Sequence, residues 1–164
     1  MSTSIYSLKA EELASDIRIL LELHHEKKIH EAVLRQVLKG ACWWISNNQG
    51  KKDSCDLWSK KALALRRAND SWEELGLVHE HIIPRNVIEE EILALRGRPT
   101  VDQITALLLH SRVCVVTAEE DKCLREKGLR QKLPSATSLT AGGSARYVEC
   151  GIEISEVPFG ASDA

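Results

Sequence analysis

The sequence Val-His-Glu-His-Ile-Ile-Pro, residues 78–84, places groups that can titrate, bind a metal and abstract protons next to one another. Two histidines flank a glutamate, and an apolar pair and a proline follow directly. Residues 77–83 alternate loosely in polarity and are rich in β-branched side chains, which predicts a short strand. Pro84 suits the first turn of a helix that continues to about Leu95. The stretch therefore predicts a strand whose end carries a cluster of polar groups.

A second segment, Val-Cys-Val-Val-Thr-Ala-Glu-Glu-Asp-Lys at 113–122, is typical of a strand that runs directly into a helix. Its first four residues are apolar and mostly branched, as in a short buried strand. Thr117 and Glu120 have the spacing of a capping box, in which each side chain accepts a hydrogen bond from the other residue's backbone. The helix is therefore expected to begin immediately after Thr117.

Two helices are predicted between these strands, at about 84–95 and 101–110, because apolar residues recur there at helical spacing. Thr100 and Gln103 supply a capping box for the second of them. We expect the two strands to pair antiparallel and the helix after Thr117 to pack across them. The end of the first strand then lies next to the first turn of that helix. The groups that meet there are Glu80, His81, Glu119, Glu120 and Asp121.

The first 70 residues predict three helices, at about 9–27, 31–48 and 53–69. In the second helix Trp43 and Trp44 extend the apolar stripe, so we expect them in the core, with base stacking as the alternative. The third helix lies in the most basic segment of the chain. That segment forms either a solvated face or a face that follows phosphates.

Composition restricts the class of protein. The formal net charge is −2, so the chain as a whole does not attract nucleic acid and any such binding requires local patches. The five cysteines are odd in number and lack close pairs, which favours reduced thiols over disulfides or a zinc site. No apolar run approaches the ~20 residues that span a bilayer. A cytoplasmic protein without membrane contact is expected, because the N-terminal residues also lack the pattern of a signal peptide.

A family resemblance rests on the two segments. Glu-His-Ile-Ile-Pro at 80–84 resembles the first half of the HNH motif, in which an acidic residue and a histidine precede an aliphatic residue and a proline. Val-Val-Thr-Ala-Glu-Glu-Asp-Lys at 115–122 resembles the second half, a strand and threonine leading into the helix that supplies the last metal ligand. The chain thus resembles the ββα-metal (HNH) endonucleases within residues 77–124.

The resemblance implies a metal-dependent endonuclease that hydrolyses DNA phosphodiester bonds. His81 would be the general base that deprotonates the attacking water, since histidine ordinarily titrates near neutrality. Glu80 would be a ligand for Mg²⁺ or Mn²⁺, hard cations that prefer carboxylate oxygen. His79 and Glu120 are accessory candidates. Basic residues near the site could clamp phosphates: Arg85, Arg112, Lys122 and Arg125.

The sequence departs from the family in the helix. The family supplies an asparagine or histidine ligand there, whereas an alignment without gaps gives Lys122, which cannot bind a metal. Asp121, one residue earlier, can bind one. Asn86 is the distant candidate for the family's loop asparagine, and the segment between Pro84 and Val113 is longer than most HNH loops. Either Asp121 replaces the missing ligand, or the site has lost its metal.

The expected fold class is α+β and predominantly helical, with an N-terminal three-helix region and then a ββα-metal-like unit that carries a helical insertion between its strands. The helical region covers 1–70 and the ββα-metal-like unit covers 71–134. Residues 135–164 are expected to form a loop-rich tail, because 135–144 are small and polar, with one helical turn and an edge strand within 145–154 and a frayed end. At this length we expect all three parts in one compact domain.

A non-catalytic reading stays open. The chain would then be a mostly helical protein-interaction module, an adaptor or an inhibitor, with a degenerate HNH-like site and a protein partner. Its acidity and its incomplete ligand set favour this alternative. Glu80 and His81 would form a buried hydrogen-bonded pair, and Glu119 and Glu120 would serve the helix dipole. A cysteine hydrolase is a weaker option, since burial of Cys114 in a strand would raise its pKa.

Overall fold

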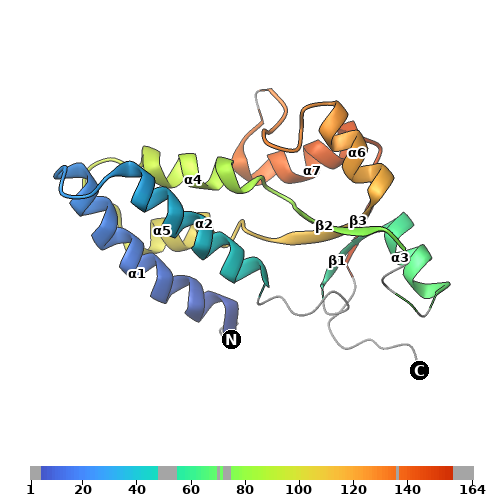
Figure 1. Ribbon diagram of the computed structural model, residues 1–164, viewed down its shortest axis with the longest axis horizontal. Helices are drawn as coiled ribbons and strands as arrows, with labels where there is room; N and C mark the ends of the chain where they lie inside the picture. The colour runs from blue at the N-terminus through green and yellow to red at the C-terminus, as the bar shows by residue number, and fades with distance from the viewer. Residues whose placement is uncertain (1–4, 48–54, 70, 72–74, 136, 157–164) are drawn as a thin grey trace. The chain divides into compact units, whose positions relative to one another are not determined.

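The computed structural model describes residues 5–47, 55–69, 71, 75–135 and 137–156 (Figure 1). The helices are α1 (Ile5–His25), α2 (Glu31–Asn47), α3 (Lys60–Arg67), α4 (Arg85–Ala94), α5 (Val101–Leu108), α6 (Ala118–Glu126) and α7 (Leu139–Glu149). The strands are β1 (Leu57–Ser59), β2 (Leu77–His81), β3 (Val113–Thr117) and β4 (Ile154–Glu156). The predicted α+β, predominantly helical class is confirmed. No helix within the described ranges combines the length and apolar character that crossing a bilayer requires.

The chain divides into two compact units. The first contains residues 1–48 and 85–111, and the second contains 49–84 and 112–164. The helical insertion between β2 and β3 therefore folds with the N-terminal helices, while the two strands that flank it belong to the other unit.

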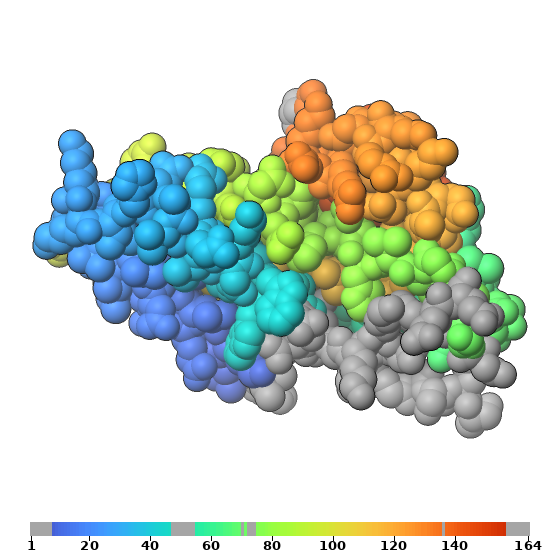
Figure 2. Space-filling model, viewed as in Figure 1, coloured from blue at the N-terminus to red at the C-terminus, as the bar shows by residue number. Residues whose placement is uncertain are grey.

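The first unit is a group of four helices. α1 packs on α2 and α5, and α4 packs on the same two helices. Figure 2 shows α1 and α2, in blue to cyan, side by side along one surface of this unit. Its interior is aliphatic, and the predicted capping box of Thr100 and Gln103 begins α5. The fully buried side chains include Ile17, Leu21, Leu34, Leu38, Ile88, Ile92, Ile104 and Leu108.

The tryptophan pair of α2 lies on the surface. Trp43 is 54% exposed and Trp44 is 37% exposed, so the prediction that they belong to the core is wrong. Cys42 and Ile45 occupy the inward positions of this turn instead. A helix buries only a stripe of its surface, and two consecutive residues beside that stripe fall outside it. The ammonium group of Lys9 lies 4.5 Å from the centre of the Trp44 ring, a cation–π contact.

The second unit is built on a four-stranded sheet in the order β2-β3-β1-β4. β2 and β3 pair antiparallel, from Leu77 opposite Thr117 to His81 opposite Val113, as the sequence predicts. β1 pairs parallel with β3 and antiparallel with β4. An edge strand is present as β4, which begins at Ile154, the last residue of the segment where one was expected.

β1 replaces part of the third predicted helix. Residues 57–59 form a buried strand, and the helix α3 begins only at Lys60. The side chain of Ser59 caps α3 by accepting a hydrogen bond from the backbone N–H of Ala62 at 3.0 Å. The helical spacing of apolar residues predicted the wrong structure at 57–59, because pairing with β3 and β4 overrides the local preference for a helix there. The beginning of the predicted helix, at 53–54, lies outside the described residues.

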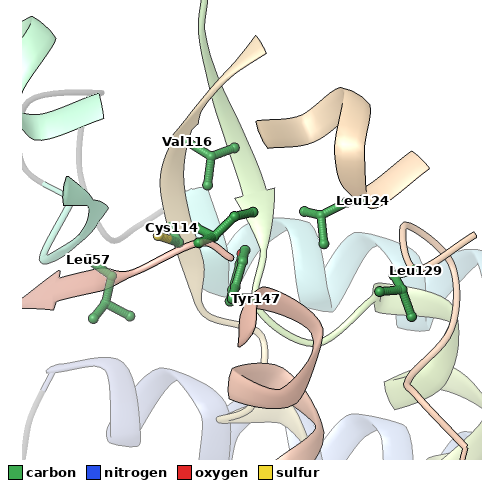
Figure 3. Packing of buried hydrophobic residues seen from close by; sticks show 7 residues of the cluster. Leu57, Cys114, Val116, Leu124, Leu129 and Tyr147 are labelled. Atoms are coloured by element: carbon green, nitrogen blue, oxygen red, sulfur yellow. The ribbon is translucent and has the colours of Figure 1, made fainter. Parts of the chain in front are cut away.

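Apolar clusters cover both faces of the sheet. On one face α3 contributes Ala62 and Leu63 to a cluster with Trp58, Val113 and Val115. On the other face α6 and α7 enclose a second cluster, with the ring of Tyr147 near its centre (Figure 3). That second cluster consists of Leu57, Cys114, Val116, Leu124, Leu129, Tyr147 and Ile152.

α7 forms where a loop was predicted. The loop expected at 135–144 is wrong from Leu139 onward, where a helix of 11 residues begins. Ser138 caps this helix by accepting a hydrogen bond from the backbone N–H of Ala141 at 3.3 Å. Gly142 and Gly143, which indicate a loop in the sequence, are buried inside the helix. A Cβ atom built on Gly143 would lie 2.5 Å from Cγ2 of Ile82, so the absent side chain allows α7 to approach the end of β2.

We expect Gly143→Ala to lower the free energy of unfolding by about 1–3 kcal/mol, because its methyl group overpacks the contact with Ile82. Gly40→Ala is the matched control, since Gly40 lies within α2 and a Cβ atom there meets nothing within 4 Å. That control should gain about 1 kcal/mol from helix propensity. Urea denaturation followed by circular dichroism measures both changes. Equal gains in the two variants would contradict close packing of α7 on β2.

Candidate functional site

The candidate site lies where β2 ends beside α6. Glu80 pairs with Cys114 across the sheet, and Cys114 belongs to the cluster under α6 and α7. Side chains alternate between the faces of a strand, so Glu80 points toward α6 and α7. His81 is opposite Val113, which belongs to the cluster under α3. The carboxylate and the imidazole therefore leave β2 on opposite faces, and His81 is the last residue of the strand.

Glu80 forms an ion pair with Arg146 of α7. Nη2 of Arg146 donates a hydrogen bond to Oε1 of Glu80 at 2.7 Å, and the arginine side chain is 0% exposed. Burial raises the pKa of Glu80 above its usual 4.5, and the neighbouring guanidinium opposes that rise. The partner of Glu80 is thus an arginine that the sequence does not single out, because no motif surrounds it and its contacts come from distant segments.

Asp121 lies within electrostatic range of Glu80, since its negative charge also contributes to the raised pKa of that carboxyl group. Asp121 is buried in the first turn of α6. Its Oδ1 atom has no hydrogen-bond partner among the described residues, and the nearest cation is Nε of Arg130 at 3.6 Å. The structure therefore places two of the predicted ligands within electrostatic range of each other.

Glu120 has a structural role at the corner between β3 and α6. Its Oε2 atom accepts hydrogen bonds from the backbone N–H of Thr117 at 2.9 Å and from the hydroxyl of Ser59 at 2.6 Å. Oγ1 of Thr117 accepts a hydrogen bond from the backbone N–H of Glu120 at 3.2 Å. The predicted capping box is present, and it also joins α6 to β1. This network occupies the carboxylate that was an accessory candidate.

The histidines of β2 differ in exposure. His79 is exposed and His81 is half-buried, and strand alternation puts both on the face that α3 covers. The two residues stand opposite Val115 and Val113 of β3. His79 therefore shares a face with His81, as the sequence predicts.

The basic candidates occupy both units. Arg112 is half-exposed, and its Nη2 atom lies 2.9 Å from Oδ2 of Asp56. Lys122 is exposed and lies 3.7 Å from Glu126 within α6, and Arg125 is exposed on the same helix. Arg85 begins α4 and belongs to the first unit. Three of the four candidates are therefore in the unit that contains β2 and α6.

The donor chemistry of Glu80 and Asp121 suits a hard divalent cation. Mg²⁺ is usually bound by one or two carboxylates and completes its shell with waters and substrate phosphates. The buried Oδ1 of Asp121 has no hydrogen-bond partner among the described residues and lies 3.6 Å from Nε of Arg130. The described residues include no group of three or more histidine, cysteine, aspartate or glutamate side chains that could hold a metal. Carboxylate oxygens are ligands of the kind that Mg²⁺ and Mn²⁺ prefer, and Oε1 of Glu80 already accepts a hydrogen bond from Arg146.

The site thus combines two buried carboxylates, a buried arginine and a histidine at the end of a strand. Asp121 and Glu80 come from the segments that carry the HNH resemblance, and Arg146 comes from α7. Comparison with protein-family models, with curated proteins and with solved structures found no match.

Proposed function

We propose that the protein is an HNH-like endonuclease that hydrolyses DNA phosphodiester bonds with the help of Mg²⁺ or Mn²⁺. The observation that supports it is the convergence of Glu80 and Asp121, which β2, β3 and α6 bring into electrostatic range. Both carboxylates occupy the segments where the resemblance expects metal ligands. An antiparallel pair followed directly by a helix is also the order of a ββα-metal unit.

In this proposal Glu80 and Asp121 would hold the divalent ion through their carboxylate oxygens. The bound ion would stabilise the charge that develops on the phosphate. His81 accepts a proton from the attacking water through its imidazole. Because β2 ends at His81, the strand no longer separates the two faces beyond it. Because Glu80 and His81 leave β2 on opposite faces, a phosphate contacted by both the base and the carboxylates would have to lie at the end of the strand.

Binding of DNA is assigned to local positive charge, since the chain is acidic overall. Arg112, Lys122 and Arg125 lie in the same unit as the carboxylates and reach solvent. Their charges would contact phosphates and fix the register of the backbone without reading the base sequence.

A second candidate is the non-catalytic interaction module with a degenerate site. The ion pair between Glu80 and Arg146 favours it, because a buried carboxylate that already has a cation is explained without a metal. A protein partner would then take the place of DNA.

Plasmid nicking by the purified protein separates the two candidates. Cleavage is expected with Mg²⁺ or Mn²⁺ and not with EDTA, and Asp121→Ala should abolish it. The same variant should change the melting temperature little, because the lost ion pair with the half-exposed Arg130 is offset by removal of a buried oxygen without a hydrogen bond and of a negative charge near Glu80. Asp16→Ala, an exposed position in α1, is the control and should cleave normally. Failure of the wild type to cleave with either ion would overturn the nuclease proposal.

A further inference from the structure

Arg146 is the most completely buried charge in the described part of the chain, with no exposed surface. A guanidinium group is stable inside a protein only when its N–H donors find acceptors. Arg146 meets this condition with four acceptors. Its partners are the carbonyl of Leu129, the carbonyls of His81 and Ile82, and the carboxylate of Glu80.

These acceptors lie at the centre of the candidate site. Nη1 donates to the carbonyl of His81 at 2.7 Å and to that of Ile82 at 2.8 Å, while Nη2 holds Oε1 of Glu80. One planar group therefore fixes three consecutive residues at the point where β2 ends. Nε donates to the carbonyl of Leu129, just beyond α6, at 2.7 Å. The side chain thus links the strand to the segment that follows the helix.

Two other residues of α7 help to bring Arg146 to the end of β2. Gly143 allows the helix to approach Ile82, as described above, and Tyr147 fills the centre of the cluster under α6. Arg146 lies between these two positions in the sequence, and its guanidinium carbon lies 5.9 Å from the centre of the Tyr147 ring. The rigid planar fork of arginine matches several acceptors at once, whereas the ammonium group of a lysine carries its donors on a single atom.

We propose that Arg146 is a positioning residue of the nuclease site, which sets the orientation of Glu80 and of the His81 backbone from α7. This inference rests on the proposed function. It adds a residue outside both segments of the HNH resemblance and makes α7 part of the site. Arg146 does not touch DNA in this account, because its donors are already engaged inside the protein.

The test compares Arg146→Lys with Arg98→Lys, an exposed arginine of the first unit. Arg146→Lys should reduce the DNA cleavage rate at saturating DNA about a hundredfold, as small displacements of catalytic groups do. The DNA affinity of Arg146→Lys, measured without divalent ions, should stay at the wild-type value. In Arg98→Lys both the cleavage rate and the DNA affinity should equal those of the wild type. NMR spectra provide a readout that does not depend on cleavage. The imidazole resonances of His81 should shift in Arg146→Lys, while those of His25 in α1 should not.

Each outcome decides something. Unchanged His81 resonances and an unchanged cleavage rate in a folded Arg146→Lys protein would overturn the positioning role. If the His81 resonances shift in Arg146→Lys but the wild-type protein never cleaves DNA, Arg146 still positions β2, and the proposed nuclease activity is wrong. If Arg146→Lys does not fold, Glu80→Gln serves instead, because its amide oxygen can still accept from Arg146. In a folded Glu80→Gln protein the His81 resonances should stay in place, because Arg146 still holds the carbonyls of His81 and Ile82; a shift of those resonances would contradict the proposal.

Discussion

Arg146→Met is expected to lower the free energy of unfolding by about 3–5 kcal/mol, the usual result of removing one member of a buried ion pair. The loss has two parts. Glu80 would stay buried without its cation, and the carbonyls of Leu129, His81 and Ile82 would lose their donor. Chemical denaturation in urea, with the slope of the transition checked for two-state behaviour, measures the change.

A double-mutant cycle separates those parts. Glu80→Leu removes the buried charge, so adding it to Arg146→Met should cost less than the sum of the single changes. Glu80→Leu should recover only part of the stability that Arg146→Met loses, because the three backbone carbonyls still lack a donor. The ion pair of Lys60 and Glu153 joins distant parts of the chain on the exposed surface, and its cycle should give little coupling. Strict additivity at Arg146 and Glu80 would mean that they do not interact in the folded protein.

His81→Ala should reduce metal-dependent DNA cleavage about 10²- to 10⁴-fold, the contribution of a positioned general base. The single-turnover rate of nicking at saturating DNA is the relevant measurement, since it excludes effects on binding. Added imidazole should restore part of the rate, because a free base can occupy the space that the side chain leaves. His25→Ala, at an exposed position in α1, is the control for loss of a histidine.

Other outcomes for His81→Ala would have distinct meanings. A normal rate would remove His81 from the mechanism, and the opposite directions of Glu80 and His81 on β2 would then be the reason. A reduced rate without rescue by imidazole, together with a lower melting temperature, would assign His81 to the structure of the strand end.

The parts of the fold that were predicted correctly depend on local signals. β2, β3 and α6 follow from apolar patterns, and the capping boxes at Thr100 and Thr117 follow from pairs of residues three positions apart. Antiparallel pairing of β2 and β3 followed from the same order of elements. These features need no knowledge of distant segments, so a sequence pattern is enough.

The parts that were missed depend on distant partners. β1 has three residues and exists because β3 and β4 pair with it, which the pattern at 57–59 does not encode. The buried glycines of α7 resemble a loop unless the contact with Ile82 is known. Arg146 was missed for the same reason, since its four acceptors lie 17 to 66 positions away in the sequence. Three of the four residues of the candidate site, Glu80, His81 and Asp121, were therefore predicted from its motifs, and Arg146 was not.

The interruption between β2 and β3 has a consequence for folding kinetics. The strands are separated by α4 and α5, which belong to the other unit, yet the backbone N–H of Ile82 still donates to the carbonyl of Arg112 at 2.9 Å. Pairing of the strands requires closure of that long loop, whose entropic cost falls once α4 and α5 have packed and their ends are fixed. The sheet should therefore form late, after the helical unit. A core substitution in the helical unit, such as Ile92→Ala, should slow the assembly of β2 with β3.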